Sequence, residues 1–249
     1  MSKVLGEAGR YVSQQSIKKY QKQFIAIFLI TCVFAFGVGC LVGARPKGLF
    51  SYALLVLLLI TFILAHKKLD RDVASLERER LQFRKGAVGE AVVAHVLDNF
   101  PDDYYVINDI TTDFGNIDHV VVGPSGAYII DTKNWKGVVE ADGSGELLLN
   151  GRPTSKPEVK NLIRRIMSIK SKIEVLSPLK DPFIRGLLVF PSAHVKATWG
   201  STGHVHCLTD EQLYDYIVEN IRGKKLTAKE VDAFSQSFLA LARMDKDFA

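Results

Sequence analysis

The chain has 249 residues, enough for one domain of ordinary size with additional segments. Its formal net charge is +5, but residues 1–85 hold 14 Lys and Arg against 5 Asp and Glu, whereas residues 86–249 hold 18 against 22. The overall basicity therefore does not indicate a nucleic-acid-binding domain, and the 3 cysteines exclude a disulfide framework.

The N-terminal part predicts two membrane-spanning helices. Residues 1–23 are polar, whereas residues 24–44 and 49–65 carry no charge. As helices they would be about 32 and about 26 Å long, against a hydrocarbon core of roughly 30 Å. We expect a transmembrane hairpin over residues 24–65 of a cell (inner) membrane protein, with the lipid bilayer as a partner. Lysines at both outer ends place both termini and the soluble domain in the cytoplasm. The alternative is a buried helix pair.

Residues 66–85 are highly charged and keep an imperfect apolar stripe at helical spacing. We expect a helical linker, which is either solvated or paired with a second copy of the chain. The membrane hairpin offers a second route to a homo-oligomer. From Gly86 to Phe100 the pattern predicts an amphipathic helix with Val88, Val92 and Leu97 facing inward. Glu90 falls outside this stripe, as an exposed residue or one favoured by the helix N-terminus.

A β-hairpin is predicted where two β-branched runs, 117–122 and 127–133, flank Gly123-Pro124-Ser125-Gly126. With these four residues as the loop, Val122 faces Ala127 and Val121 faces Tyr128. Asp118 then faces Asp131, and Lys133 points to the same side because side chains alternate along a strand. The register therefore gathers two carboxylates and one ammonium at the open end of the hairpin.

Such a grouping destabilises the sheet unless it is compensated, because like charges directly opposite one another repel. A divalent cation would relieve the repulsion, and Mg²⁺ is typically held by one or two carboxylates with waters and phosphates. A lysine beside a metal-bound water can orient it, help to deprotonate it, or stabilise developing negative charge. On spacing alone, a solvated surface ion cluster is an equal alternative.

The remaining pattern predicts an α/β fold. Strands are expected at 104–110, 138–140, 146–149, 183–190 and 205–208, a helix at 161–176, and two capped helices within 209–249. The runs V-V-V and Y-I-I are apolar on both faces, so a mixed sheet needs helices on both sides. Residues 152–180 hold eight Lys and Arg against two Asp and Glu. Lys160, Arg164 and Arg165 could contact phosphates there, or form a solvated face.

Three blocks carry a resemblance to a known family: Gly86–Glu90, Ile117–Gly123 and Asp131–Gly137. The pattern D-x(12)-D-x-K resembles the core of the PD-(D/E)xK nuclease superfamily, and the three blocks in this order resemble its nuclease-related domain, NERD, over about residues 85–191. The resemblance implies a restriction-endonuclease-like mixed sheet. We expect the nuclease domain at 86–208, with C-terminal helices at 209–249 packed on it.

The resemblance implies Mg²⁺- or Mn²⁺-dependent hydrolysis of DNA or RNA at the cytoplasmic membrane face. The catalytic residues would be Glu90, Asp118, Asp131 and Lys133. Asp118, Asp131 and the Thr132 carbonyl would bind the metal, and Glu90 would bind a second metal or orient the ligands. The family pattern has a Gln where this chain has Lys160. A catalytically weak or inactive membrane-tethered nucleic-acid-binding or scaffold protein is therefore an alternative, as is an enzyme acting on another phosphate.

Overall fold

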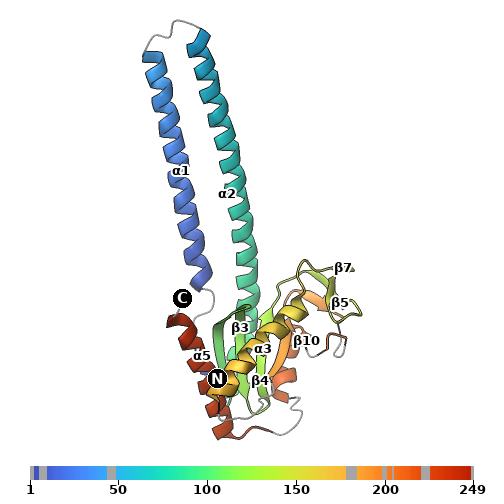
Figure 1. Ribbon diagram of the computed structural model, residues 1–249. Helices are drawn as coiled ribbons and strands as arrows, with labels where there is room; N and C mark the ends of the chain where they lie inside the picture. The colour runs from blue at the N-terminus through green and yellow to red at the C-terminus, as the bar shows by residue number, and fades with distance from the viewer. Residues whose placement is uncertain are drawn as a thin grey trace. The chain divides into compact units, whose positions relative to one another are not determined.

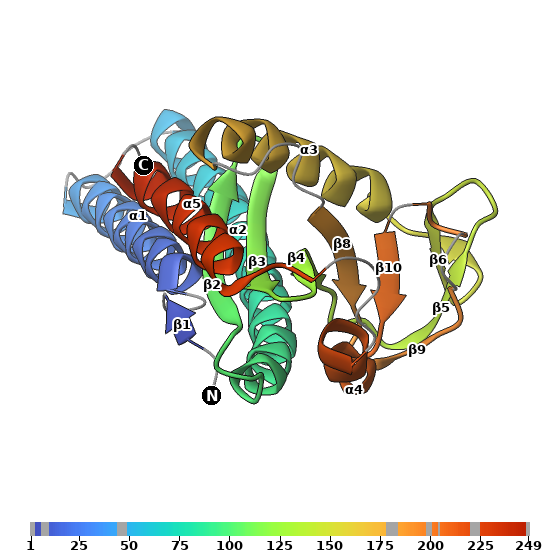
Figure 2. The same ribbon diagram turned by 90° about the horizontal axis from the view of Figure 1, so that it is seen from below.

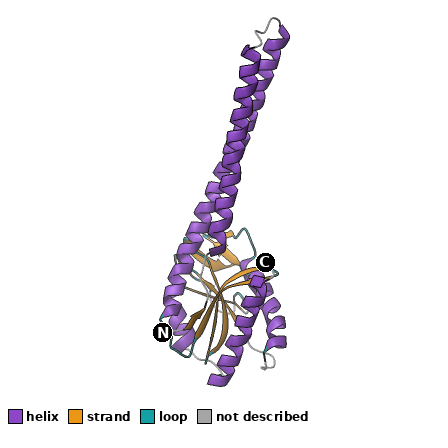
Figure 3. Cartoon of the chain, turned by 90° about the vertical axis from the view of Figure 1, so that its left-hand side faces the viewer, coloured by secondary structure: helices purple, strands orange, loops and turns teal. Residues whose placement is uncertain are grey.

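The computed structural model describes residues 3–5, 10–43, 49–177, 184–197, 201–203, 205–219 and 225–247 (Figure 1). The chain divides into two compact units: one holds Lys85–Ala249 with the first eight residues, and the other holds Gly9–Arg84. The strands all belong to the first of these units, while the described part of the second is helical (Figure 3).

Two long helices, α1 (Arg10–Gly43) and α2 (Leu49–Asp98), supply the helical unit, and α2 continues past Arg84 into the other unit. Phe34 of α1 stacks on Phe62 of α2 with ring centroids 4.1 Å apart. This stacked pair of rings is a direct side-chain contact between the two helices.

The prediction of membrane spans at 24–44 and 49–65 is wrong. Among the described residues, no helix carries a stretch both long and apolar enough to cross a bilayer. The charge-free runs are not helices of their own: α1 begins at Arg10, and α2 runs on through the charged segment to Asp98. The predictions of a two-span inner-membrane localisation and of the lipid bilayer as a partner depend on these spans and are therefore not supported either. The loop expected at 45–48 lies outside the described residues.

A six-stranded mixed sheet is the centre of the unit that begins at Lys85 (Figure 2). Its order is β1-β2-β3-β4-β8-β10; β2, β3 and β4 are antiparallel neighbours, and the other neighbouring pairs are parallel. The strands are β1 (Lys3–Leu5), β2 (Tyr105–Thr112), β3 (Gly115–Gly123), β4 (Gly126–Thr132), β8 (Ile184–Val189) and β10 (Val205–Leu208).

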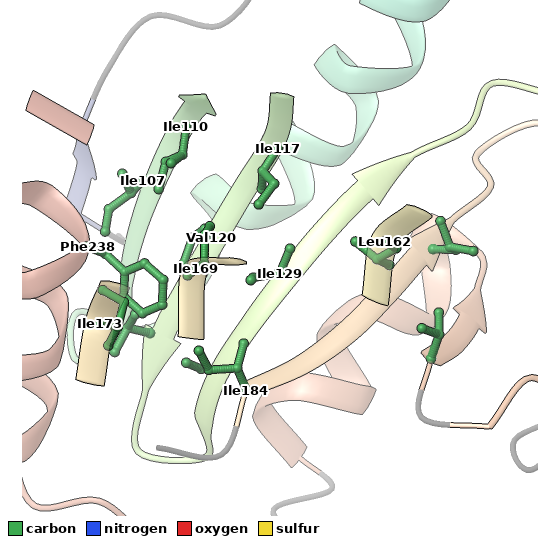
Figure 4. Packing of buried hydrophobic residues seen from close by; sticks show 14 of the residues in the cluster. Ile107, Ile110, Ile117, Val120, Ile129, Leu162, Ile169, Ile173, Ile184 and Phe238 are labelled. Carbon is green, nitrogen blue, oxygen red and sulfur yellow. The ribbon is translucent and has the colours of Figure 1, made fainter. Parts of the chain in front are cut away.

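Each face of this sheet has its own apolar core, because successive strand residues point to opposite sides. Val120 and Ile129 pack with Phe238 and other residues of α3 (Glu158–Leu176) and α5 (Ala228–Asp247), as Figure 4 shows. Val121 and Ile130 pack with the end of α2, α4 (Asp210–Tyr214) and the π-helical turn η1 (Asp215–Glu219). The mixed α/β architecture with helices on both faces agrees with the sequence prediction.

The helix starts expected in the C-terminal part are present. Thr209 and Gln212 form a capping box before α4, and Thr227 with Glu230 forms a second one before α5. Each box satisfies backbone N–H groups that the first helical turn leaves unpaired. Gly223, expected to end the first of these helices, lies outside the described residues.

A second, four-stranded sheet in the order β7-β6-β5-β9 lies beside the first helical turn of α3 (Figure 2). Its strands are β5 (Gly137–Ala141), β6 (Leu147–Leu149), β7 (Arg152–Pro153) and β9 (Ala193–Val195). Glu146, just before β6, accepts hydrogen bonds from the backbone N–H groups of Val159 at 3.2 Å and Lys160 at 2.8 Å. A carboxylate is favoured there by the helix dipole, so this contact fixes where α3 begins.

Candidate active site

The β3–β4 hairpin has the predicted register. Val122 pairs with Ala127, Val121 with Tyr128, and the last recorded pair is His119 with Ile130. The same register continued by one residue sets Asp118 opposite Asp131. Pairing also extends through Gly123 and Gly126, so the loop is shorter than the four residues expected.

The carboxylates of Asp118 and Asp131 interact with different groups. Asp118 Oδ2 accepts a hydrogen bond from the Thr132 backbone N–H at 2.7 Å. Asp131 is buried, with Oδ1 2.9 Å from Arg165 Nη1 and Oδ2 2.8 Å from Lys133 Nζ. Both oxygens of Asp131 therefore face a cation from the protein itself.

These contacts extend into a chain of four alternating charges. Lys133 Nζ also lies 3.3 Å from Glu158 Oε2 in the first turn of α3. Arg165 Nη1 donates a second hydrogen bond, at 2.6 Å, to the Asn116 backbone carbonyl on β3. The chain Arg165–Asp131–Lys133–Glu158 thus ties α3 to the ends of β3 and β4.

Glu90 comes to the same region from α2, where Gly89 allows a close approach. A Cβ at Gly89 would lie 2.7 Å from Asn134 Cβ and 3.4 Å from Thr132 Cγ2, just after and at the end of β4. This contact goes with the face of α2 that points to the sheet. Val93 and Leu97 are buried on it, whereas Val88 and Val92 are 56% and 38% exposed. The inward stripe predicted for Val88 and Val92 is therefore wrong.

A third strand contributes Asp109, which sequence analysis did not single out. The β2–β3 register sets it opposite Asp118, between the Asn108–His119 and Ile110–Ile117 pairs. Its φ of 62° lies in the left-handed region, which aspartate tolerates better than most residues. Its carboxylate accepts a hydrogen bond from the Asn116 side chain.

Burial and the crowding of carboxylates shift the pKa values of the site residues. Burial, with the charges of Asp131 and Glu90, raises the pKa of Asp118 to about 8, against which the Thr132 N–H acts only in part. Burial, with Asp109 and Asp131, also raises the pKa of Glu90. Burial by itself would lower the pKa of Lys133, but Asp131 and Glu158 outweigh it, and the pKa is raised. Lys133 therefore stays protonated at neutral pH.

Part of the chain matches a known protein family. Residues 85–191 match the model of the nuclease-related domain family, NERD. The resemblance carried by the three sequence blocks is thereby confirmed, and the family belongs to the PD-(D/E)xK nuclease superfamily. An uncharacterized protein of Bacillus anthracis is 27% identical over 169 residues, which cover 66% of this chain and 79% of that protein. No solved structure matches the chain.

The oxygen atoms gathered here suit a hard divalent cation in their chemistry, since carboxylate and carbonyl oxygens are the ligands that Mg²⁺ prefers. Burial and then the neighbouring carboxylates raise the pKa of Asp118, and a bound cation would oppose both by favouring the ionised form. Within the described parts of the chain, however, no three His, Cys, Asp or Glu side chains gather round one point as metal ligands. The ion pairs of Asp131 account for this arrangement, because they turn its oxygens toward Arg165 and Lys133.

The predicted basic residues of α3 separate into two groups. Lys160 and Arg164 are exposed, whereas Arg165 is buried on Asp131. Sequence analysis missed Glu158 as a site residue and considered Arg165 only for phosphate contact. A signal was present: the two residues are seven apart, two helical turns, and so share one face of α3. Lys160, at the expected Gln position, lies outside that face.

The close approach at Gly89 gives a testable result. Gly89→Ala should destabilise the protein by up to about 2 kcal/mol, because a clash of about 1–3 kcal/mol with Asn134 opposes a gain in helix propensity of about 1 kcal/mol. Gly86→Ala is the matched control, since its nearest neighbour would be Glu90 Oε1 at 3.9 Å. It should be neutral or stabilising. Denaturant unfolding measures both, and equal shifts in the two variants would contradict the contact.

Proposed function

We propose that the NERD domain hydrolyses phosphodiester bonds of nucleic acid, DNA or RNA, with Mg²⁺ or Mn²⁺. The observation that carries the proposal is the Asp131–Lys133 ion pair of 2.8 Å at the end of β4, with Asp118 and its raised pKa on the neighbouring strand. A surface ion cluster would be solvated, whereas Asp131 is 3% exposed and its pairing with Lys133 is largely shielded from water.

Asp118, Asp131 and the Thr132 carbonyl would hold the cation, and Glu90 would bind beside them or orient a bound water. The cation would supply Lewis acidity and lower the pKa of a bound water. Lys133 keeps its proton, because Asp131 and Glu158 raise its pKa above the ordinary value. It therefore donates a hydrogen bond to the water or the scissile phosphate and stabilises developing negative charge, rather than removing a proton.

The strand of nucleic acid would meet the exposed face of α3. Lys160 and Arg164 are exposed one turn apart on this helix, within the basic segment 152–180. Such contacts with phosphates position a substrate without reading its sequence. Because residues 86–249 carry more acidic than basic side chains, we expect weak binding, with a salt dependence that reflects a small number of phosphate contacts.

A second function is favoured by two observations. Asp131 is already neutralised by two protein cations, and Lys160 stands where the family pattern has Gln. A nucleic-acid-binding or scaffold protein with weak or no catalysis would keep this arrangement, because it needs the fold and the basic face of α3 but not a metal on Asp131.

Incubation of the full-length chain with single- and double-stranded DNA and RNA, in Mg²⁺, Mn²⁺ or EDTA, separates these functions. Cleavage that EDTA abolishes and Mn²⁺ restores supports the nuclease. Binding without cleavage in any metal supports the binding protein. Neither binding nor cleavage would leave both proposals without support and direct the search to other phosphate esters.

A further inference from the structure

The turn between β2 and β3 presents an aromatic side chain that the roles assigned above leave unused. β2 ends at Thr112 and β3 begins at Gly115, so Asp113 and Phe114 form the tip of the turn. Phe114 is 58% exposed. Turns favour Gly, Pro, Asn, Asp and Ser, because these residues suit the backbone conformations that a turn needs. The geometry of the turn therefore does not account for a phenylalanine at this position.

The backbone that carries the Phe114 ring is held in place. The Thr112 hydroxyl donates to a backbone carbonyl of the turn at 2.6 Å and accepts a hydrogen bond from the Phe114 N–H at 3.2 Å. Asp113 Oδ2 accepts a hydrogen bond from Ser168 Oγ of α3 at 3.3 Å and lies 3.7 Å from Lys172 Nζ. Because the turn is fixed before a ligand arrives, little conformational entropy is lost when the ring binds one.

Phe114 lies at the end of the sheet that carries the candidate active site. It precedes Asp118 by four residues, so the two Cα atoms are at most about 14 Å apart along β3. Between them, the Asn116 side chain donates to Asp109, and the Asn116 carbonyl accepts from Arg165. Nucleotides in a stacked strand advance about 3.4 Å each. A strand with a phosphate at the carboxylates therefore has a base at the ring only a few nucleotides away.

Basic side chains lead from this turn along α3. Lys160, Arg164 and Lys172 are spaced by four and eight residues and therefore follow one face of the helix. Lys172 is the one that pairs with Asp113, next to the ring. Proteins that bind single-stranded nucleic acid combine such a positive track for phosphates with an aromatic side chain on which a base stacks. In a duplex each base is covered by its neighbours, so the ring can reach only a base that has left the stack.

The exposed apolar side chains near this turn allow a competing explanation, a contact with another protein. In the described part of the chain after Val92, the exposed large apolar residues are Phe114, Met167, Val175 and Leu176. A protein contact would use all four through the apolar area that it buries, whereas base stacking needs the flat ring of Phe114 alone. The exposed basic residues of α3 favour a polyanion over an apolar partner.

We propose that Phe114 is a base-stacking residue, and that the substrate of this site is single-stranded nucleic acid or a single-stranded end or loop. The inference rests on the proposed function in nucleic-acid binding, whose substrate class it names. Lys160 and Arg164 contact phosphates, and one base stacks on the ring.

Fluorescence anisotropy with labelled oligonucleotides of about 12 nucleotides, in EDTA at low salt, tests the full-length chain without metal or cleavage. The parent should bind the single strand, DNA or RNA, more tightly than the duplex of the same sequence. Phe114→Leu should weaken single-strand binding at least about fivefold, because a base loses its stacking partner. Phe114→Tyr keeps the ring and should bind like the parent.

Two controls separate stacking from apolar contact. Val175→Ala should bind like the parent, since Val175 is 85% exposed on the same helix but has no ring. An abasic strand of the same length, which has phosphates but no bases, should bind the parent and Phe114→Leu equally. Equal losses in Phe114→Leu and Val175→Ala would overturn the inference and indicate an apolar interface.

Unchanged single-strand binding in Phe114→Leu, a duplex bound as tightly as the single strand, or no binding by the parent would also overturn it. Ring-dependent binding of single strands without cleavage in Mg²⁺ or Mn²⁺ would support the inference while counting against the nuclease. Metal-dependent cleavage of single strand and duplex at equal rates, unaffected by Phe114→Leu, would do the reverse. The two proposals therefore fail separately.

Discussion

Replacing Lys133 by alanine should reduce cleavage at least about 100-fold while Mn²⁺ still binds. The ammonium is expected to act on the water or the transition state without holding the metal, and removing such a donor typically costs a factor of about 10²–10³ in kcat. Metal affinity should not fall, since the variant carries one positive charge fewer beside Asp131. Cleavage rates at saturating substrate and Mn²⁺ titration of the same preparations measure the two effects.

Lys136→Ala is the matched control for Lys133, because Lys136 lies three residues on in the same loop and is exposed. It should cleave at the parental rate. Loss of Lys133 removes the ion pair of Glu158, so thermal unfolding must show that the variant is folded. The double variant Lys133→Ala/Glu158→Gln removes the unpaired charge of Glu158 and restores the balance of charge. Equal cleavage by folded Lys133→Ala and parent, free of contaminating nuclease, would remove Lys133 from the mechanism.

Asp118→Asn should make the metal-free protein more stable at alkaline pH. The pKa of Asp118 is raised in the folded state to about 8, from an ordinary value of 3.8 in the unfolded chain. Between these values the unfolded state releases a proton that the folded state keeps. The stability contributed by protonated Asp118 is therefore full below about pH 4 and is lost as pH rises through about 8. The asparagine variant lacks this loss, which amounts to at most about 6 kcal/mol.

Denaturant unfolding of parent and Asp118→Asn in EDTA, from pH 4 to 9, measures the effect as the difference between two curves. His119, whose pKa burial lowers to about 4, contributes equally to both curves and cancels. Millimolar Mn²⁺ at pH 8 should then raise the melting temperature of the parent and much less that of the variant, because a ligand bound only by the folded state stabilises it. Parallel curves, or equal metal shifts, would refute the paired-carboxylate site.

Local pattern was enough to predict the hairpin and its charges. Side chains alternate along a strand with a period of two, and the register of a hairpin is fixed by its turn, which Gly123-Pro124-Ser125-Gly126 places. Val122 therefore pairs with Ala127, and the same register sets Asp118 opposite Asp131. The same runs required helices on both faces of the sheet, and the three short blocks were enough to indicate the nuclease-related domain.

Composition over a window was not enough to predict the N-terminal helices. A charge-free run describes the hydropathy of a segment, but it does not fix where a helix begins and ends. The runs 24–44 and 49–65 belong to longer helices that also carry charged residues, and none of the described helices meets the length and hydropathy of a span.

The sequence by itself determined which residues stand at the open end of the hairpin, because they lie within one local unit whose geometry repeats every two residues. Only the tertiary structure decided their partners. Arg165 is 34 residues from Asp131 and reaches it because α3 packs across the sheet, with Glu158 two turns earlier on the same face. Glu90 approaches because Gly89 has no side chain where α2 meets β4. Such contacts depend on how helices pack, and packing is set by the whole core rather than by any one segment.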